Sequence, residues 1–586
     1  SNPAADITPA DAAFRSRGGI GRVTASSATT CPWTATSNSD FVTITASNSG
    51  GTSGTVDYQV APNAGAASRT GTLSIAGRTF SVTQSAATPE NSQTAASLST
   101  GGSRGFSTPG TSDTVEAGEA DVTLDTGKSS AERAAQLSQV WGTAVFSLKQ
   151  NNTVVSEAGV PASPPTTAAR IFIDYRSGIA AKSGAVEAGT ISVNTGIGIV
   201  NKGSNAAHLI FTLRDESGAV AAVGHGTLPT GNHRAVFIDQ LSQLAPDFTM
   251  PAGFASTTGA GTLQIQSDQP VSVVALRLTT NQRGETLMTS VPVADETRTL
   301  SGTTVYFPQV ADGGGYQTEI VLMNPTGTAQ TGQIRFYTDD GGPLTLHRAG
   351  DTGVGASSFN YTLLPGGCYL LRTDGVPASV HAGSAQVVPD AGTSVPVGVG
   401  LFAYTPLGNL FGSKILVTES GIPSAPPTTH ALVYVDQTKD HLTGLALAAV
   451  DGAAIRVTLK ALAGDGTTIV GTGSVDLSGN GHAARFVNEL ITGLPPNFAG
   501  VLELTAPTSF AALTLRGLSN TRGEFLLTTF PVADFNQPSP TPIVFPQIAD
   551  GGGYHTEIIL LNTGGQPVSL KISFFGEDGL PLDVAK

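Results

Sequence analysis

Short runs in which apolar and polar residues alternate recur along the chain and predict β-strands, because successive side chains of a strand point to opposite faces. Between residues 568 and 574, apolar Val568, Leu570, Ile572 and Phe574 alternate with polar or charged residues. Leu502 and Leu504 follow the same rule. Helical structure is predicted only for two short turns, Ala131–Leu137 and Phe237–Leu244. The pattern therefore predicts an all-β chain.

Tight-turn signals separate the predicted strands. Asp339-Asp340-Gly341-Gly342, Asp465-Gly466 and Asp578-Gly579 each stand between two apolar runs, and Asp-Gly pairs favour the turns that join antiparallel strands. Short strands joined in this way, each with one apolar face, are typical of sandwiches. We predict tandem β-sandwich domains of the immunoglobulin-like kind.

A repeat organises most of the chain. The segment Phe307–Leu344 reappears nearly unchanged as Phe545–Leu582, close to the C-terminal end. A second unit, here called type B, begins at Gly159 (GVPASPPTT) and again at Gly421 (GIPSAPPTT). The first repeated segment opens the other unit, type A, which is complete only once. The end of the complete type A unit also matches residues 115–157.

These matches predict an order of domains in which type A occurs once whole and once in two separated halves. The predicted units are an N-terminal sandwich (1–86), a linker (87–112), the second half of a type A sandwich (113–158), a type B sandwich (159–296), a complete type A sandwich (303–420), a second type B sandwich (421–535) and the first half of a type A sandwich (542–586).

The N-terminal unit contains the strand-like runs Cys31–Ser37, Phe41–Thr45, Gly54–Val60 and Arg69–Ile75, and it closes with Phe80-Ser81-Val82-Thr83-Gln84. This order resembles the BACON domain, an immunoglobulin-like sandwich of secreted bacterial proteins with a proposed carbohydrate-binding role. The second aromatic position of that family, commonly Trp, is Phe41 here. The resemblance implies that Trp33 and Tyr58 are candidates for stacking on a sugar, with core packing as the alternative.

The repeats themselves resemble those of large secreted bacterial proteins that carry an FPxxADGGG signature, here at Phe307 and Phe545. That resemblance covers most of residues 113–586 and implies no active site.

Composition and charge narrow the function classes. The formal net charge is −14, with 30 Lys and Arg against 44 Asp and Glu, which disfavours nucleic acid as a partner. No apolar run reaches the length of a membrane span. A charged fraction of only 13% with many hydroxyl and amide side chains favours export, so we predict an extracellular or cell-surface location. Cys31 and Cys368 lack metal or redox spacing and are expected to be small buried residues rather than a disulfide.

Candidate chemistry is sparse. The Gly-rich stretches after Asp312 and Asp550 lack the Lys-Ser/Thr of a phosphate loop and predict tight strand connections. The pairs Arg283/Glu285 and Arg522/Glu524 predict an ion pair or turn rather than acid–base catalysis. His233 and His482 correspond across the type B units and are interpreted as solvated loop residues. We therefore predict no enzyme, no catalytic residue, no metal and no cofactor.

The two halves of type A are complementary, and a half sandwich exposes an apolar face and unpaired strand edges. We expect residues 542–586 of one molecule to complete residues 113–158 of the next, giving an extracellular head-to-tail filament. The expected donor residues are Phe545, Tyr554, Ile558, Leu560, Val568, Leu570, Ile572, Phe574 and Leu582. The expected acceptor residues are Val115, Val122, Trp141, Val145, Phe146, Leu148 and Val154.

Three alternatives stay open at this stage. The two halves can meet within one chain and close a monomeric four-domain ring. The chain can instead be a glycan-binding adhesin, with Trp33 and Tyr58 as the sugar platform and the repeats as its stalk. A chain cut artificially at Lys586 would make the half domain an artefact.

Overall fold

The computed structural model describes the chain except residues 1–5, 15, 17, 27–31, 47–48, 52, 64, 66, 87–91, 125–128, 181–189, 258, 299–303, 407–414, 531 and 585–586. The described chain is built almost entirely from β-strands in separate sheets, which confirms the predicted all-β class and the tandem sandwich architecture. Cys31 lies outside the described residues, and Cys368 is a buried free thiol.

The N-terminal sandwich packs two sheets on a core that includes Val23, Trp33, Tyr58, Leu73 and Phe80. The sheet orders are β1-β3-β7-β5 and β2-β9-β8-β4-β6. Its strands are β1 Asp6–Thr8, β2 Asp11–Phe14, β3 Gly19–Ser26, β4 Trp33–Ser37, β5 Val42–Ala46, β6 Ser49–Gly50, β7 Ser53–Val60, β8 Arg69–Ile75 and β9 Arg78–Gln84.

The complete A domain pairs two four-stranded sheets, β24-β29-β26-β27 and β28-β25-β30-β31. Phe307, Ile320, Phe336 and Phe402 meet between them, as the alternation along these strands requires. Its strands are β24 Val305–Asp312, β25 Tyr316–Met323, β26 Gln330–Tyr337, β27 Ser358–Leu363, β28 Cys368–Arg372, β29 His381–Pro389, β30 Val397–Tyr404 and β31 Thr418–Pro423.

The split A domain has the same two sheets, assembled from both ends of one chain. Its sheet orders are β10-β42-β12-β40 and β11-β41-β13-β14, so each strand matches one of the complete A domain in a circularly permuted order. The interruption falls between β42 and β10, where the complete domain continues from β26 into β27. The strands are β10 Gln93–Leu98, β11 Ser103–Ser107, β12 Glu116–Leu124, β13 Val140–Gln150, β14 Thr153–Pro161, β40 Ile543–Asp550, β41 Tyr554–Asn562 and β42 Val568–Gly576.

The prediction of a linker over residues 87–112 is therefore wrong for most of that segment. β10 pairs with β42 from Gln93↔Ser573 to Leu98↔Val568, and β11 pairs with β41. Both strands lie at the outer edge of their sheets, where one side of the backbone has no neighbour. Ala96 and Leu98 of β10 still face the core, but they are flanked by small and polar residues, so the apolar periodicity is too short to predict a strand.

Each B domain is a sandwich whose two sheets share one long strand. Residues 260–267 of β21 pair with β15 and β18, whereas residues 271–280 pair with β17 and β22. The strands of the first B domain are β15 Thr166–Asp174, β16 Arg176–Ala180, β17 Thr190–Asn201, β18 Ala207–Asp215, β19 Val220–Leu228, β20 His233–Phe237, β21 Ala260–Thr280, β22 Thr286–Val291 and β23 Val293–Asp295. Those of the second are β32 Thr428–Asp436, β33 His441–Ala449, β34 Ile455–Ala463, β35 Ile469–Leu477, β36 His482–Phe486, β37 Ala499–Ser519, β38 Phe525–Phe530 and β39 Ala533–Asp534.

Helices are few and short among the described residues. The predicted turn at Ala131–Leu137 is helix α1, Ser130–Leu137, whose start is capped by Ser129 and Glu132. The predicted turn at Phe237–Leu244 is the 3₁₀ helix η2, Ile238–Gln243. The others are α2, Phe254–Thr257, and α3, Val487–Leu490. Within the described ranges, no helix has the length and apolar character to cross a membrane.

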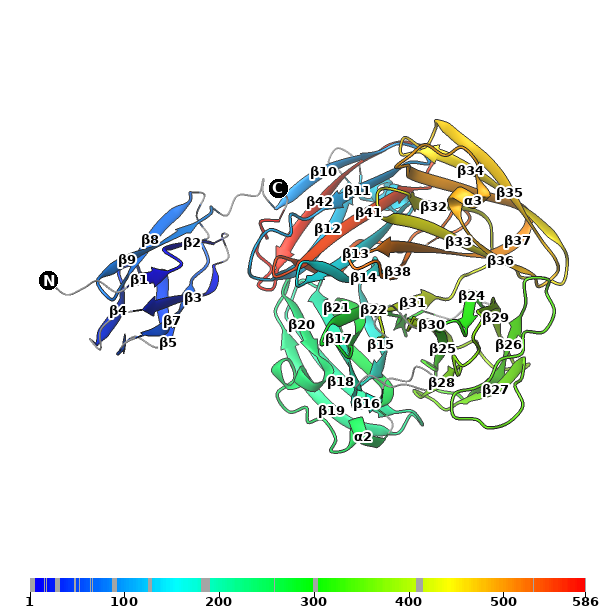
Figure 1. The fold of residues 1–586 in the computed structure, drawn as a ribbon, viewed down its shortest axis with the longest axis horizontal. Coiled ribbons are helices and arrows are strands. Elements are labelled where there is room, and N and C mark those ends of the chain that lie inside the picture. Colours follow the sequence, from blue (N-terminus) through cyan, green and yellow to red (C-terminus); the bar gives the residue numbers. More distant parts are fainter. Residues whose placement is uncertain are drawn as a thin grey trace.

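The four repeat domains form a closed ring, from which the N-terminal sandwich stands apart (Figure 1). The order around the ring is split A, first B, complete A and second B. Four strands, one from each domain, meet near its axis: β14 contacts β22 and β38, and β31 contacts the same two strands. Gly159 of β14 is required at this meeting point, because an added Cβ would lie 2.0 Å from the carbonyl oxygen of Thr529. Gly421 of β31 has the same relation to Ser290.

Candidate functional site on the ring axis

The closure of the split A domain brings the two predicted half-domain surfaces together within one chain. The shared core contains the predicted donors Phe545, Ile558, Leu560, Val568, Leu570, Ile572, Phe574 and Leu582 with the predicted acceptors Val122, Phe146 and Leu148. Tyr554 packs at the margin of this core. The two halves are thus complementary, and they meet within one chain, as the alternative of a monomeric ring requires.

The remaining predicted acceptors lie elsewhere. Val115 is half exposed beside the Gly552 turn. Trp141 and Val145 face the second B domain rather than the split core. The carbonyl oxygen of Val154 accepts a hydrogen bond from Asn520 Nδ2, at 3.0 Å. Trp141, Val145 and Val154 therefore contribute to the contact between domains, whereas Val115 lies at the surface of the split A domain.

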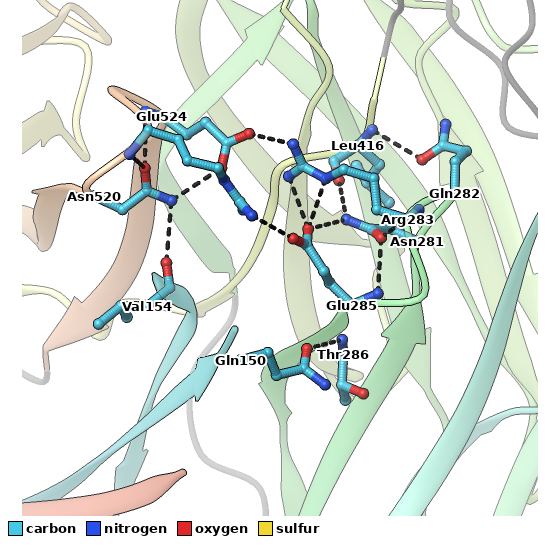
Figure 2. Close-up of polar contacts among 11 residues, drawn as sticks. Gln150, Val154, Asn281, Gln282, Arg283, Glu285, Thr286, Leu416, Asn520 and Glu524 are labelled. Carbon is cyan, nitrogen blue, oxygen red and sulfur yellow. Dashed lines mark hydrogen bonds and ion pairs between the residues drawn. The ribbon is translucent and has the colours of Figure 1, made fainter. Parts of the chain in front are cut away.

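Two arginine–glutamate loops cross at one end of the axis (Figure 2). Arg283 Nη1 lies 2.5 Å from Glu524 Oε1, and Arg522 Nη1 lies 2.6 Å from Glu285 Oε1. Each arginine also pairs with the glutamate of its own loop. Partial burial favours a higher pKa for the Glu524 carboxyl, but the contacts with Arg283, Asn520 and Arg522 outweigh it and hold this pKa below its ordinary value. The predicted ion pairs within each loop exist, and the crossed pairs, which were not predicted, join the two B domains to each other.

A buried arginine fastens each B domain to the last strand of an A-type domain. Arg277 Nη1 donates to Glu419 Oε2 at 2.5 Å, and its Nε donates to Asp174 Oδ2 at 3.0 Å. Burial opposes its charge, but Glu419 and Asp174 raise the pKa of Arg277 above its ordinary value. This contact was not predicted from the sequence, although Arg277 and Arg516 stand at the same position inside an apolar strand of the two B repeats.

The corresponding contact at the split A domain carries more negative charge. Arg516 Nη1 donates to Glu557 Oε2 at 2.9 Å, while Glu157 and Asp436 lie within 3.6 Å of the same guanidinium. Arg176 and Arg372, which balance the carboxylates beside Arg277, lack counterparts among the contacts of Arg516. The boundary between the split A domain and the second B domain, here called the seam, thus sets one arginine against three carboxylates, with His441 Nε2 2.6 Å from Arg516 Nη2.

The repeated histidines are buried at domain interfaces, and their interpretation as solvated loop residues is wrong. His233 of the first B domain has its Nε2 2.9 Å from Gln547 Oε1 of the split A domain. His482 of the second B domain has its Nε2 2.8 Å from Gln309 Oε1 of the complete A domain. Both are at most 3% exposed. The FPQ segment of each A-type domain therefore recognises a histidine of a neighbouring B domain.

We expect His482 to make the ring less stable in mild acid. Burial lowers the pKa of His482 below 6.5, and the contact with Asp339 opposes that shift only in part. The unfolded chain then takes up the proton more readily, so this contribution is complete above pH 6.5 and is lost as the pH falls through and below that value. The melting temperature should fall less between pH 7.5 and 5.5 in His482→Gln than in the parent. Replacing the exposed His347 with Gln is the control, and an equal fall in the parent and His482→Gln contradicts the assignment.

An acidic pair marks the interface between the split A domain and the first B domain. Lys202 Nζ lies 3.0 Å from Glu119 Oε2 and 2.7 Å from Asp121 Oδ2. Burial and the neighbouring Asp121 raise the pKa of Glu119 to about 7, against the effect of Lys202. This carboxyl therefore titrates near neutral pH in the folded ring.

Trp33 and Tyr58 belong to the core of the N-terminal sandwich, at 6% and 1% exposure. The interpretation of Trp33 and Tyr58 as a platform for sugar stacking is therefore wrong, and the alternative of core packing holds, because neither ring presents a face to solvent. Trp33 is covered by Gly50 and Gly54, at which a Cβ would lie within 3 Å of the indole.

The Gly-rich stretches form tight turns, as predicted. Gly313, Gly314 and Gly315 all have positive φ, the region in which glycine is favoured. The adjacent Asp312 is buried, and its Oδ1 accepts a hydrogen bond from the Gly375 amide at 2.9 Å. No group of three or more potential metal-ligating side chains gathers in the part of the chain that the structure describes.

A cavity of about 460 Å³ lies at the opposite end of the four axial strands from the crossed loops, and we call it the axial cavity. β14 and β22 leave the neighbourhood of the loops at Thr153 and Thr286 and end at the cavity with Pro161 and Val291. The repeated segments noted in the sequence supply much of its wall, including Pro161, Pro164, Pro423 and Pro426, and Pro292 and Pro540 also line it.

Comparisons with known proteins give limited likeness. No protein-family model matches the chain, and no curated protein matches it. A Bacteroides ovatus GH5 xyloglucanase, solved with a XXXG heptasaccharide, is 16% identical over 14% of this chain and 19% of that chain, with a TM-score of 0.13. A Bacteroides thetaiotaomicron protein is 14% identical over 15% of this chain and 86% of its own, with a TM-score of 0.11. The infectious bursal disease virus VP2 subviral particle is 11% identical over 70% and 87%, with a TM-score of 0.10. The match thus spans about a fifth of the xyloglucanase, and no activity is assigned from these likenesses.

Proposed function

We propose that the chain is an extracellular, non-enzymatic scaffold in which a closed ring of four sandwiches holds the N-terminal sandwich on a rigid base. One observation carries this proposal: residues 543–576 pair with β10, β11, β12 and β13 of their own chain. Every strand position of the complete A domain is thereby filled in the split one. The low charge density and abundant hydroxyl side chains support the extracellular location.

The contacts around the axis support rigidity. The crossed arginine–glutamate loops tie the two B domains together, and the buried arginines tie each B domain to an A-type strand. Apolar clusters also run across domain boundaries, as where Leu561 packs with Leu432 and Val501. A ring held at each boundary resists the hinge motion that is usual between tandem domains.

The head-to-tail filament is a second candidate that uses the same strands. The two halves of the split A domain are joined only by strand pairing and packing, so residues 542–586 of another copy can satisfy the same partners. Exchange between copies would build a polymer from the interface that closes the monomer.

A cross-strand disulfide separates the two candidates. Ser97 and Ser569 face each other across β10 and β42 and are both exposed. In a background without Cys31 and Cys368, oxidised Ser97→Cys/Ser569→Cys should run as a single monomeric species with altered mobility on a non-reducing denaturing gel. Thr331→Cys/Thr362→Cys, at the corresponding pair of the complete A domain, controls for cross-linking within a domain. A ladder of covalent oligomers from the first pair alone would reject the ring and support the filament.

A further inference from the structure

We propose that the axial cavity is a binding site for a neutral, mainly apolar aromatic molecule. Its volume of about 460 Å³ falls within the range of about 300–1,000 Å³ that is usual for small-molecule pockets. All four repeat domains contribute to its wall through Thr143, Val274, Val399 and Phe530, among others. The site therefore exists only when the ring is closed.

The repeat explains why the chain leaves this space open. Corresponding segments of the two halves approach the axis from opposite sides, so a large side chain from one half meets its counterpart from the other. The segments accordingly carry small residues, such as Ala162 and Ser424, and prolines. Proline has no backbone N–H, so these prolines supply apolar surface without a donor.

The two sides of the cavity differ, which gives a bound molecule a direction. Trp141 and Phe530 line it on the seam side. The repeat places Val397 and Val291 at the positions that correspond to them in the other half. Aromatic rings and prolines offer flat apolar faces, which favour a planar ring system over a flexible chain that must lose rotational freedom on binding.

The charged groups argue for a neutral ligand. The carboxylates of Asp295 and Asp534 already accept hydrogen bonds from Thr166 and Thr428, at 2.6 and 2.8 Å. Arg298 is paired with Asp295 at 3.0 Å and is mostly exposed. A charged molecule would lose its hydration on entering the cavity and would gain no ion-pair partner there, and such a transfer is costly.

The test uses the neutral probe 6-propionyl-2-dimethylaminonaphthalene, whose emission moves to shorter wavelength in apolar surroundings. The chain has two tryptophans, so Trp33→Phe leaves Trp141 as the sole energy donor beside the cavity. We expect saturable one-to-one binding with a dissociation constant below about 100 μM, blue-shifted emission, and energy transfer from Trp141.

Filling the cavity should abolish this binding. Ala162→Phe and Ser424→Phe are each expected to weaken it by at least about tenfold, because a phenyl ring occupies the space of the probe. Thr352→Phe, on an exposed loop of the complete A domain, should bind like the parent. Should the filled variants fail to fold, energy transfer in the unfilled chain still decides the question. Absence of saturable binding, unchanged binding in both folded filled variants, or binding without transfer from Trp141 would each overturn the proposal.

Discussion

A chain that ends at Thr541 is expected to lose the folded structure of residues 92–161 while the other domains keep theirs. The deletion removes β40, β41 and β42, and with them Phe545, Ile572 and Phe574 from the centre of the split core. Loss of several fully buried aromatic and aliphatic side chains, at about 2–5 kcal/mol each, exceeds the usual stability of one domain, about 5–15 kcal/mol.

Limited proteolysis with mass spectrometry checks this result. Early cleavage should fall within residues 92–161 of the truncated chain and should be suppressed by adding residues 542–584 as a separate peptide. A chain that begins at Ser92, which lacks the N-terminal sandwich, is the matched control and should resist cleavage like the parent. Resistance of residues 92–161 in the truncated chain would show that they fold without the C-terminal strands.

Replacing Arg277 with Leu is expected to cost about 3–5 kcal/mol of unfolding free energy, the usual penalty for leaving buried charges without their partner. Its side chain is 4% exposed, and its removal leaves Glu419, which is 7% exposed, without its arginine, whereas Asp174 keeps its ion pair with Arg176. Urea unfolding followed by circular dichroism measures the loss.

Two further variants separate this explanation from loss of packing. Adding Glu419→Gln to Arg277→Leu removes the buried carboxylate that has lost its arginine and should recover much of the stability. Arg456→Ala breaks an ion pair with Asp476 in which both side chains are at least 65% exposed, and it should change stability by no more than about 1 kcal/mol. Equal losses in the single and double variants would assign the effect to packing alone.

Much of the fold could be predicted from alternation, turns and self-similarity, because a sandwich strand must present one apolar face. The strands of residues 568–574 and 502–504 and the helix near Ala131 follow from such local patterns. The edge strands β10 and β11 could not be predicted in this way. Ala96 and Leu98 are the buried apolar residues of β10, with exposed Ser97 between them, and so short an alternation does not distinguish this segment from a linker.

The segments that form the axial site could be recognised from the sequence, but their arrangement could not. The repeated Arg-Gly-Glu and proline-rich segments were visible in the sequence, but their meeting depends on the closure of the ring. The same reason accounts for His233 and His482, which look like loop residues until a neighbouring domain covers them. Local sequence describes a residue's own strand, whereas these roles are defined by another domain.

The antiparallel pairing of β10 with β42 determines how the ring responds to tension. Residue 93, where the chain enters β10, pairs with Ser573 near the end of β42, so the first and last strands of the ring are neighbours whose outward ends lie side by side. A force that pulls these two points apart acts on their hydrogen bonds one after another, as in opening a zipper, rather than on all of them in shear. The ring is therefore stiff under load across its domains and yields at low force when pulled by its two ends.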